Sequence, residues 1–170
     1  LPVGVILTIA SAGSEASNSC VIQNDVTKVK QGFNNDLVRP LFAIEDPELT
    51  SSVPPFQTAC GIADTMMHSL ERYFSFDPVH QLSDDWALDL VKDVMVNGKK
   101  ALENPNDYDA RAALMLDSTL SHNGLTGLAK RVKFVVHPLE HALSGYKKDV
   151  THGAGVALLY SAWARYVYER

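Results

Sequence analysis

A pair of prolines, Pro54-Pro55, separates two parts of the 170-residue chain that differ in hydrophobic periodicity. Neither proline can continue a strand ladder, because proline has no backbone N–H to donate. Before the pair, short apolar runs rich in β-branched residues predict three strands, at residues 3–9, 20–23 and 41–44. After the pair, apolar residues recur every three or four positions, which is typical of amphipathic helices. The chain is therefore expected to be mainly α, a helical bundle preceded by a few short strands.

Five helices are predicted after the prolines. They lie around residues 62–74, 86–102, 108–120, 135–143 and 151–168. Asn104-Pro105 ends the second helix, because the residue before a proline disfavours helical geometry. Ser144-Gly145 is expected to close the fourth.

Composition excludes several classes of protein. Apolar residues make up 46% of the chain and charged residues 21%, which argues against disorder. Fifteen Lys and Arg against 20 Asp and Glu give a net charge of −5, which argues against nucleic acid or an anionic membrane as partner. Cys20 and Cys60 are too few for a disulfide framework or a thiolate metal cluster. A reducing compartment is expected, with a single bridge between the two cysteines as the alternative.

The apolar run at residues 1–12 has two interpretations. It ends in small residues like a secretory signal, but it has no basic leader and is too short to span a bilayer. A buried strand is the prediction. The chain has no initiator Met, and its final helix reaches Arg170 without a capping residue. Both observations lead us to expect a segment of a longer protein.

Histidines and acidic residues recur at helical spacing in the second part. Asp64 and His68 are one turn apart, as are His137 and His141, and His152 follows. An Asp on an otherwise apolar helix is costly unless it is paired or ligated. Four nitrogen or oxygen groups from three helices would then converge on one divalent cation, and the alternative is ordinary core or surface histidines. A zinc protease is excluded, because no Glu follows the first His of the pair.

A loop of small and polar residues at positions 10–19 follows the first predicted strand. Such a stretch brings backbone N–H groups close to a phosphate or a flat ring, although most are plain surface loops. The Gly-rich phosphate-binding motifs GxGxxG and GxxxxGK[ST] do not occur in the sequence.

Three segments carry a family resemblance: residues 61–68 (GIADTMMH), 137–141 (HPLEH) and 149–153 (DVTHG). They resemble the metal-binding segments of iron-containing alcohol dehydrogenases, and the butanol dehydrogenase type is the most similar branch. Supporting motifs stand in the matching order at residues 30–33 (KQGF), 42–47 (FAIEDP) and 162–168 (AWARYVY).

The resemblance implies site residues by position. The implied metal ligands are Asp64, His68, His137 and His152. His141 matches the family's non-ligand histidine near the nicotinamide and is the implied catalytic residue. The implied cofactor contacts are Thr8, Ala12, Gly13, Lys30, Leu49 and Val53. Ala12 departs from the threonine usual in the family, so one hydroxyl contact is missing there.

The resemblance also implies domains and cofactors. Residues 1–54 would be the C-terminal remnant of the nucleotide-binding α/β domain, and 55–170 a dehydroquinate synthase-like, metal-binding helical domain that is incomplete at its C-terminus. The implied cofactors are Fe²⁺, with Zn²⁺ as the alternative, and NADH or NADPH. The family's pyrophosphate-binding loop would precede Leu1, so this chain alone is expected to bind dinucleotide weakly and to turn over little.

The implied activity is hydride transfer between NAD(P)H and a primary alcohol or aldehyde such as butanol or butanal. The resemblance further implies a cytoplasmic enzyme that forms homo-oligomers at full length. Two alternatives stay open: a non-catalytic metal-binding helical module, and a glycerol dehydrogenase-like enzyme, against which His68 argues.

Overall fold

The structure, a computed structural model, describes residues 2–75 and 78–169. These residues form four strands, three short 3₁₀ helices and five α-helices, so the expectation of a mainly α chain is confirmed. The strands are β1 (Gly4–Leu7), β2 (Ser19–Gln23), β3 (Lys30–Asn34) and β4 (Phe42–Glu45). The α-helices are α1 (Pro55–Tyr73), α2 (Gln81–Glu103), α3 (Tyr108–His122), α4 (Val136–Tyr146) and α5 (His152–Tyr168). The 3₁₀ helices are η1 (Asp36–Val38), η2 (Pro47–Thr50) and η3 (Leu125–Gly127).

The strands form two separate pairs. β1 and β4 are parallel, in a register that places Gly4 opposite Phe42, and β2 and β3 form an antiparallel hairpin. The sequence analysis missed β3, because Lys-Gln-Gly-Phe-Asn is not an apolar run and its strand geometry comes from pairing with β2. The prediction of a buried first strand was wrong for most of its side chains: Leu7 is buried, but Ile6 is 60% exposed.

The five helices lie where they were predicted, and their bounds differ most at the starts of α1 and α2 and at the end of α4. α1 begins at Pro55 itself, a residue well suited to the first helical position because its missing N–H has no partner there. α4 continues through Ser144 and Gly145 to Tyr146, so the prediction that these residues close the helix was wrong. A Cβ on Gly145 would lie 2.5 Å from the carbonyl oxygen of Lys28. Gly145 therefore allows the β2–β3 hairpin to approach α4.

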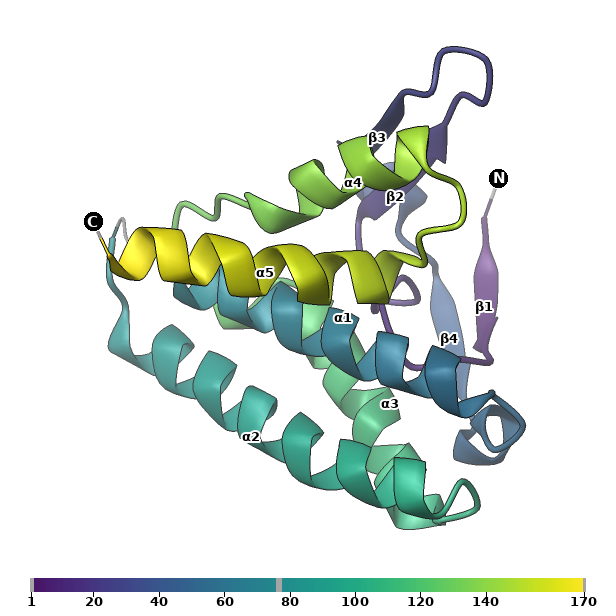
Figure 1. The fold of residues 1–170 in the computed structure, drawn as a ribbon. Coiled ribbons are helices and arrows are strands. Elements are labelled where there is room, and N and C mark those ends of the chain that lie inside the picture. The colour runs from purple at the N-terminus through teal and green to yellow at the C-terminus, as the bar shows by residue number, and fades with distance from the viewer. Residues whose placement is uncertain (1, 76–77, 170) are drawn as a thin grey trace.

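Helix α1 is the centre of the fold. In Figure 1 it lies between α5 and α4 on one side and α2 and α3 on the other. One buried cluster joins α2 to α3, and partly buried Ile62 of α1 packs against it; its buried members are Leu90, Val94, Ala101, Ala110 and Leu114. A second cluster joins Met67 of α1 to Val136 of α4 and Val156 of α5. Side chains on α1 are therefore held between two cores.

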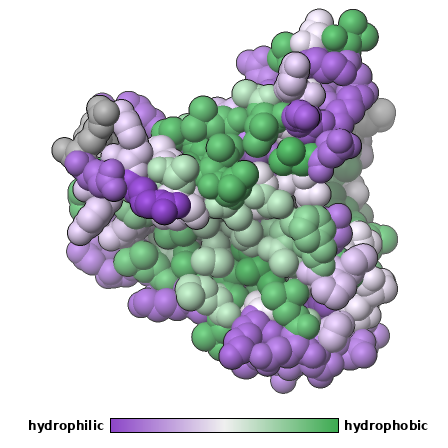
Figure 2. All heavy atoms as spheres, viewed as in Figure 1, coloured by the Kyte–Doolittle hydropathy of each residue, from purple (hydrophilic) through white to green (hydrophobic). Residues whose placement is uncertain are grey.

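Apolar side chains also gather on the surface over α4 and α5, as Figure 2 shows. Leu139 and Leu158 are exposed members of these helices. None of the helices in the described residues is both long enough and apolar enough to cross a membrane. Cys20 and Cys60 are both free thiols, so the alternative of a bridge between them is wrong.

The start of α5 touches the backbone of α1 at Gly153, and this contact gives a first prediction. A Cβ on Gly153 would lie 2.1 Å from the carbonyl oxygen of Cys60, which cannot move without moving α1. We expect Gly153→Ala to lower the free energy of unfolding by about 1–3 kcal/mol, measured by urea denaturation. Gly32→Ala is the control, because a Cβ there meets nothing within 4 Å. Equal stability of the two variants would contradict the close contact.

Candidate metal centre

Three helices bring the predicted metal ligands together. Asp64 and His68 lie one turn apart in the middle of α1. His137 is the second residue of α4 and His152 is the first residue of α5. α5 packs against α1, α4 packs against α5, and all three helices contribute to the second core cluster. The N-terminal ends of α4 and α5 therefore point their histidines at the same stretch of α1.

One carboxylate oxygen is the focus of the cluster. Asp64 Oδ1 lies 3.4 Å from His137 Nε2, 3.5 Å from His152 Nε2 and 3.6 Å from His68 Nδ1. Asp64, His68 and His137 are buried, and the His152 side chain is 30% exposed. The ligand atoms of Asp64, His137 and His152 all lie within 4.8 Å of one another, whereas His68 approaches Asp64 from outside this group. The structure thus brings together all four residues, three of them tightly.

The loop that follows β1 orients the carboxylate. Ser11 Oγ donates a 2.8 Å hydrogen bond to Asp64 Oδ2, which leaves Oδ1 facing the rings. Thr65 Oγ1 donates to the Ser11 carbonyl oxygen at 3.0 Å, and a Cβ on Gly61 would lie 2.2 Å from the Ala10 carbonyl oxygen. The sequence analysis interpreted this loop as a phosphate or ring contact, with a plain surface loop as the alternative, and missed the role of Ser11.

A buried carboxylate, Glu71 on α1, holds His137. Its Oε1 accepts from the backbone N–H groups of Val135 at 2.5 Å and Val136 at 2.6 Å, so it satisfies free donors at the start of α4. Its Oε2 accepts from His137 Nδ1. With Nδ1 occupied, His137 turns Nε2 toward Asp64. The sequence signal for Glu71 was its place three residues after His68 on an otherwise apolar helix.

A second buried carboxylate, Glu140 on α4, holds His152 in the same way. Its Oε2 accepts from His152 Nδ1 and lies 3.5 Å from Lys30 Nζ. The sequence analysis assigned no role to Glu140, although this residue stands within the HPLEH segment at 137–141.

Burial and charge set the protonation of the cluster without a metal. Burial would raise the pKa of Asp64, but the imidazoles of His68, His137 and His152 hold it well below its usual value. Burial opposes the charged form of His152, yet its bonds to Asp64 and Glu140 raise its pKa to about 9. The pKa of His137 is raised in the same manner, whereas burial lowers that of His68. Without a metal, His152 is therefore protonated near neutral pH, and the pKa of His137 is shifted in the same direction.

These shifts predict a pH-dependent stability for the metal-free protein. A raised imidazole pKa stabilises the fold fully below the unfolded value of about 6.5, and this contribution is lost as pH rises through about 9 for His152. We expect the melting temperature of chelator-treated protein to fall between pH 6.5 and 9. His152→Gln should flatten this dependence. A divalent cation binds only neutral imidazole rings, so the stabilisation that the cation adds should instead grow with pH. A melting temperature independent of pH in both the metal-free and the metal-loaded protein would contradict the assignment of these histidines as ligands.

His141 and His122 flank the cluster without facing Asp64. The His141 ring centroid lies 5.5 Å from that of His152, and the side chain is half-buried. Burial, with the charges of His152 and Lys30, lowers the pKa of His141 to about 4. The His122 ring centroid lies 4.1 Å from that of His68, and its Nδ1 accepts a 2.9 Å hydrogen bond from Arg72. His122 therefore packs in the interior.

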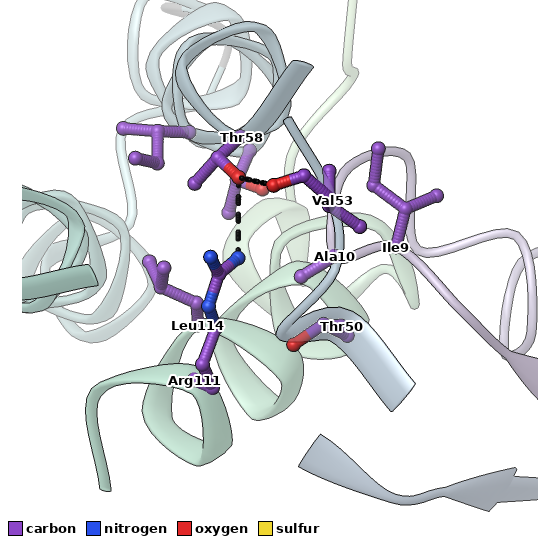
Figure 3. A pocket seen from close by; sticks show the side chains of 9 residues that line it. Ile9, Ala10, Thr50, Val53, Thr58, Arg111 and Leu114 are labelled. Atoms are coloured by element: carbon purple, nitrogen blue, oxygen red, sulfur yellow. Dashed lines mark hydrogen bonds between the residues drawn. The ribbon is translucent and has the colours of Figure 1, made fainter. Parts of the chain in front are cut away.

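The predicted cofactor contacts do not share one pocket. Val53 lines a small pocket between the loop after β1, α1 and α3, with Arg111 donating to Thr58 across it (Figure 3). Lys30 lies elsewhere, against α4. Gly13 is buried at a φ of +59°, and a Cβ there would lie 2.4 Å from a carbonyl oxygen of α3. Thr8, Ala12 and Leu49 are exposed.

The residues present fit a divalent cation. His68 Nδ1 is buried and has no hydrogen-bond partner among the described residues, although it faces Asp64. One carboxylate and three imidazoles form a donor set that suits Fe²⁺ or Zn²⁺. Glu71 and Glu140 accept hydrogen bonds from Nδ1 of His137 and His152, and metal-binding histidines usually have such a partner on the nitrogen that does not bind the metal.

The comparisons with known proteins agree with this class of site. The sequence model of the "Fe-containing alcohol dehydrogenase family, C-terminal" matches residues 58–170. The chain is 43% identical to NADH-dependent butanol dehydrogenase A of Clostridium acetobutylicum over 167 residues, which is 98% of this chain and 43% of that protein. It is 35% identical to the NADPH-dependent aldehyde reductase YqhD of Escherichia coli, over 85% of this chain and 37% of that protein.

The fold comparison is equally close. The crystal structure of NADH-dependent butanol dehydrogenase A from Thermotoga maritima matches with a TM-score of 0.95 and 35% identity, covering 99% of this chain and 42% of that one. This chain belongs to the iron-containing alcohol dehydrogenase family, and it resembles relatives of the butanol dehydrogenase type over nearly its whole length. It spans about 43% of the length of those curated relatives.

Proposed function

We propose that this protein is a metal- and nicotinamide-dependent alcohol dehydrogenase or aldehyde reductase. The observation that carries the proposal is the meeting of three histidine ring nitrogens with one oxygen of Asp64. The proposed metal ligands are Asp64, His68, His137 and His152. Fe²⁺ is the proposed cation, and Zn²⁺ suits the same donors.

The names of the relatives support the substrate class. They include NADH-dependent butanol dehydrogenases and an NADPH-dependent aldehyde reductase. We therefore propose a primary alcohol or aldehyde such as butanol or butanal as substrate, and NADH or NADPH as the second cofactor. We also propose that the protein acts in the cytoplasm as a homo-oligomer.

Three side chains near the proposed metal site would have distinct roles in the reaction. When bound, the cation supplies Lewis acidity toward the substrate oxygen, and the nicotinamide gives or takes the hydride. Glu71 and Glu140 keep a proton on Nδ1 of His137 and His152 and so aim each Nε2 at Asp64. His141, beside His152, is placed to move a proton between its ring and a substrate hydroxyl.

The first 54 residues are proposed to belong to the nucleotide-binding domain, and residues 55–170 to the metal-binding helical domain. The family match begins at residue 58, which supports a boundary near the two prolines. The proposed cofactor contacts remain Thr8, Ala12, Gly13, Lys30, Leu49 and Val53.

The experiment uses the full-length protein, because its relatives are more than twice as long as this chain. Metal is removed with a chelator, and Fe²⁺ or Zn²⁺ is added back while NADH and NADPH oxidation by butanal is followed. We expect activity to vanish and then return with the cation. Metal binding without turnover would instead support a non-catalytic metal-binding module.

A further inference from the structure

Glu140 is a carboxylate with no exposed side-chain surface. A buried carboxylate is tolerated only when paired, because removing its charge from water is costly. Its Oε2 takes both partners, His152 Nδ1 and Lys30 Nζ, while its Oε1 has no hydrogen-bond partner among residues 2–75 and 78–169. A Cβ on Gly155 would lie 2.8 Å from Glu140 Cγ, so α5 leaves space for this side chain.

Lys30 reaches Glu140 from a distant part of the chain. It is the first residue of β3, and its side chain is 16% exposed. Its ammonium donates a 2.8 Å hydrogen bond to Ser144, one turn after Glu140 on α4. The hairpin comes this close because Gly145 has no side chain: a Cβ there would lie 3.2 Å from Lys30 Cβ.

The contacts form a continuous series from the hairpin to the cluster. Lys30 Nζ lies 3.5 Å from Glu140 Oε2, the same oxygen accepts from His152 Nδ1, and His152 Nε2 lies 3.5 Å from Asp64 Oδ1. His137 differs, because its carboxylate Glu71 is held by backbone N–H groups of the α4 terminus. The positive charge that pairs with the carboxylate partner of His152 thus comes from Lys30, which precedes the segment matched by the family model, residues 58–170.

We infer that Lys30 and Glu140 are positioning residues for His152: Lys30 fixes the place of the Glu140 carboxylate by pairing with its Oε2, and Glu140 aims His152 Nε2 at the cation site. The inference rests on the proposed metal centre. It assigns Lys30 a role that does not need the dinucleotide, in addition to the proposed cofactor contact.

The test is a Co²⁺ titration of metal-free protein without nicotinamide, followed by visible absorption. Glu140→Gln and Lys30→Met are each expected to weaken Co²⁺ binding by about 10- to 100-fold and to change the absorption bands. Lys30→Arg should restore most of the affinity, because it keeps the charge. Lys148→Met is the matched control: Lys148 pairs with Asp25 between the same hairpin and the segment after α4, and both side chains are more than half exposed.

The outcomes separate the two proposals. Wild-type protein that binds no Co²⁺ would overturn the proposed metal centre, and the inference with it. Wild-type affinity and spectrum in Glu140→Gln and Lys30→Met would overturn the inference alone. If Lys148→Met weakens binding as much as Lys30→Met, the effect is one of general charge, which also overturns it. Thermal melting of each variant shows that the compared proteins are folded.

Discussion

Asp64→Asn is expected to weaken divalent-metal binding by more than about 100-fold. Substitution of a hydrogen-bond partner of a metal ligand already weakens metal affinity by about 10- to 100-fold. Asp64 is itself a proposed ligand and supplies the oxygen that three ring nitrogens face, so its loss should have a larger effect. The amide has nearly the same shape and still accepts the hydrogen bond of Ser11 through its oxygen. Elemental analysis of protein purified without chelator, with a Co²⁺ titration, measures the loss.

Asp117→Asn is the matched control. Asp117 is also a buried aspartate, on α3, and burial with the neighbouring Asp93 raises its pKa to about 7. Because a carboxyl with a pKa of about 7 is already about half protonated near neutral pH, the neutral amide should leave both stability and metal content close to wild type. Equal metal content in Asp64→Asn and Asp117→Asn would contradict the proposed site.

Local spacing predicted the part of the site that lies within single helices. Asp64 with His68, and His137 with His141, were found because an interval of four places two side chains on one face. Spacing could not choose between His141 and His152 as a ligand, since that choice depends on how α4 and α5 pack. The family resemblance made the choice, and the structure places His152 Nε2 near Asp64.

Sequence spacing could not predict the hydrogen-bond partners of the proposed ligand histidines. Glu71 and His137 are 66 positions apart, and Lys30 and Glu140 are 110 apart. Such pairs form only once the helices and the hairpin have packed together. Of the hairpin itself only the first strand was predicted, because β3 lacks an apolar run. Gly145 shows the same limit: it was interpreted locally as a helix end, but its role is a tertiary contact with the backbone at Lys28.

If the proposed activity holds, His141→Ala is expected to lower turnover of the full-length protein by about 10²- to 10⁴-fold, the usual contribution of a positioned proton-transfer group. Metal content should stay near wild type, because the His141 ring stacks beside His152 and lies 6.5 Å from that of His137, away from Asp64. Turnover with butanal, metal stoichiometry and melting temperature are measured on the same preparation.

The three readouts distinguish the possible roles of His141. If the ring only packs against α5, melting temperature should fall while turnover changes little. Loss of the metal would mean that His141, which with Glu140 and His152 forms a second group of ligand atoms within 4.8 Å, binds the cation in place of one proposed ligand. His141→Gln sharpens the test, because an amide retains hydrogen bonding but cannot take up a proton near neutral pH. A loss as large in His141→Gln as in His141→Ala, with metal unchanged, would therefore identify proton transfer as the contribution of this residue.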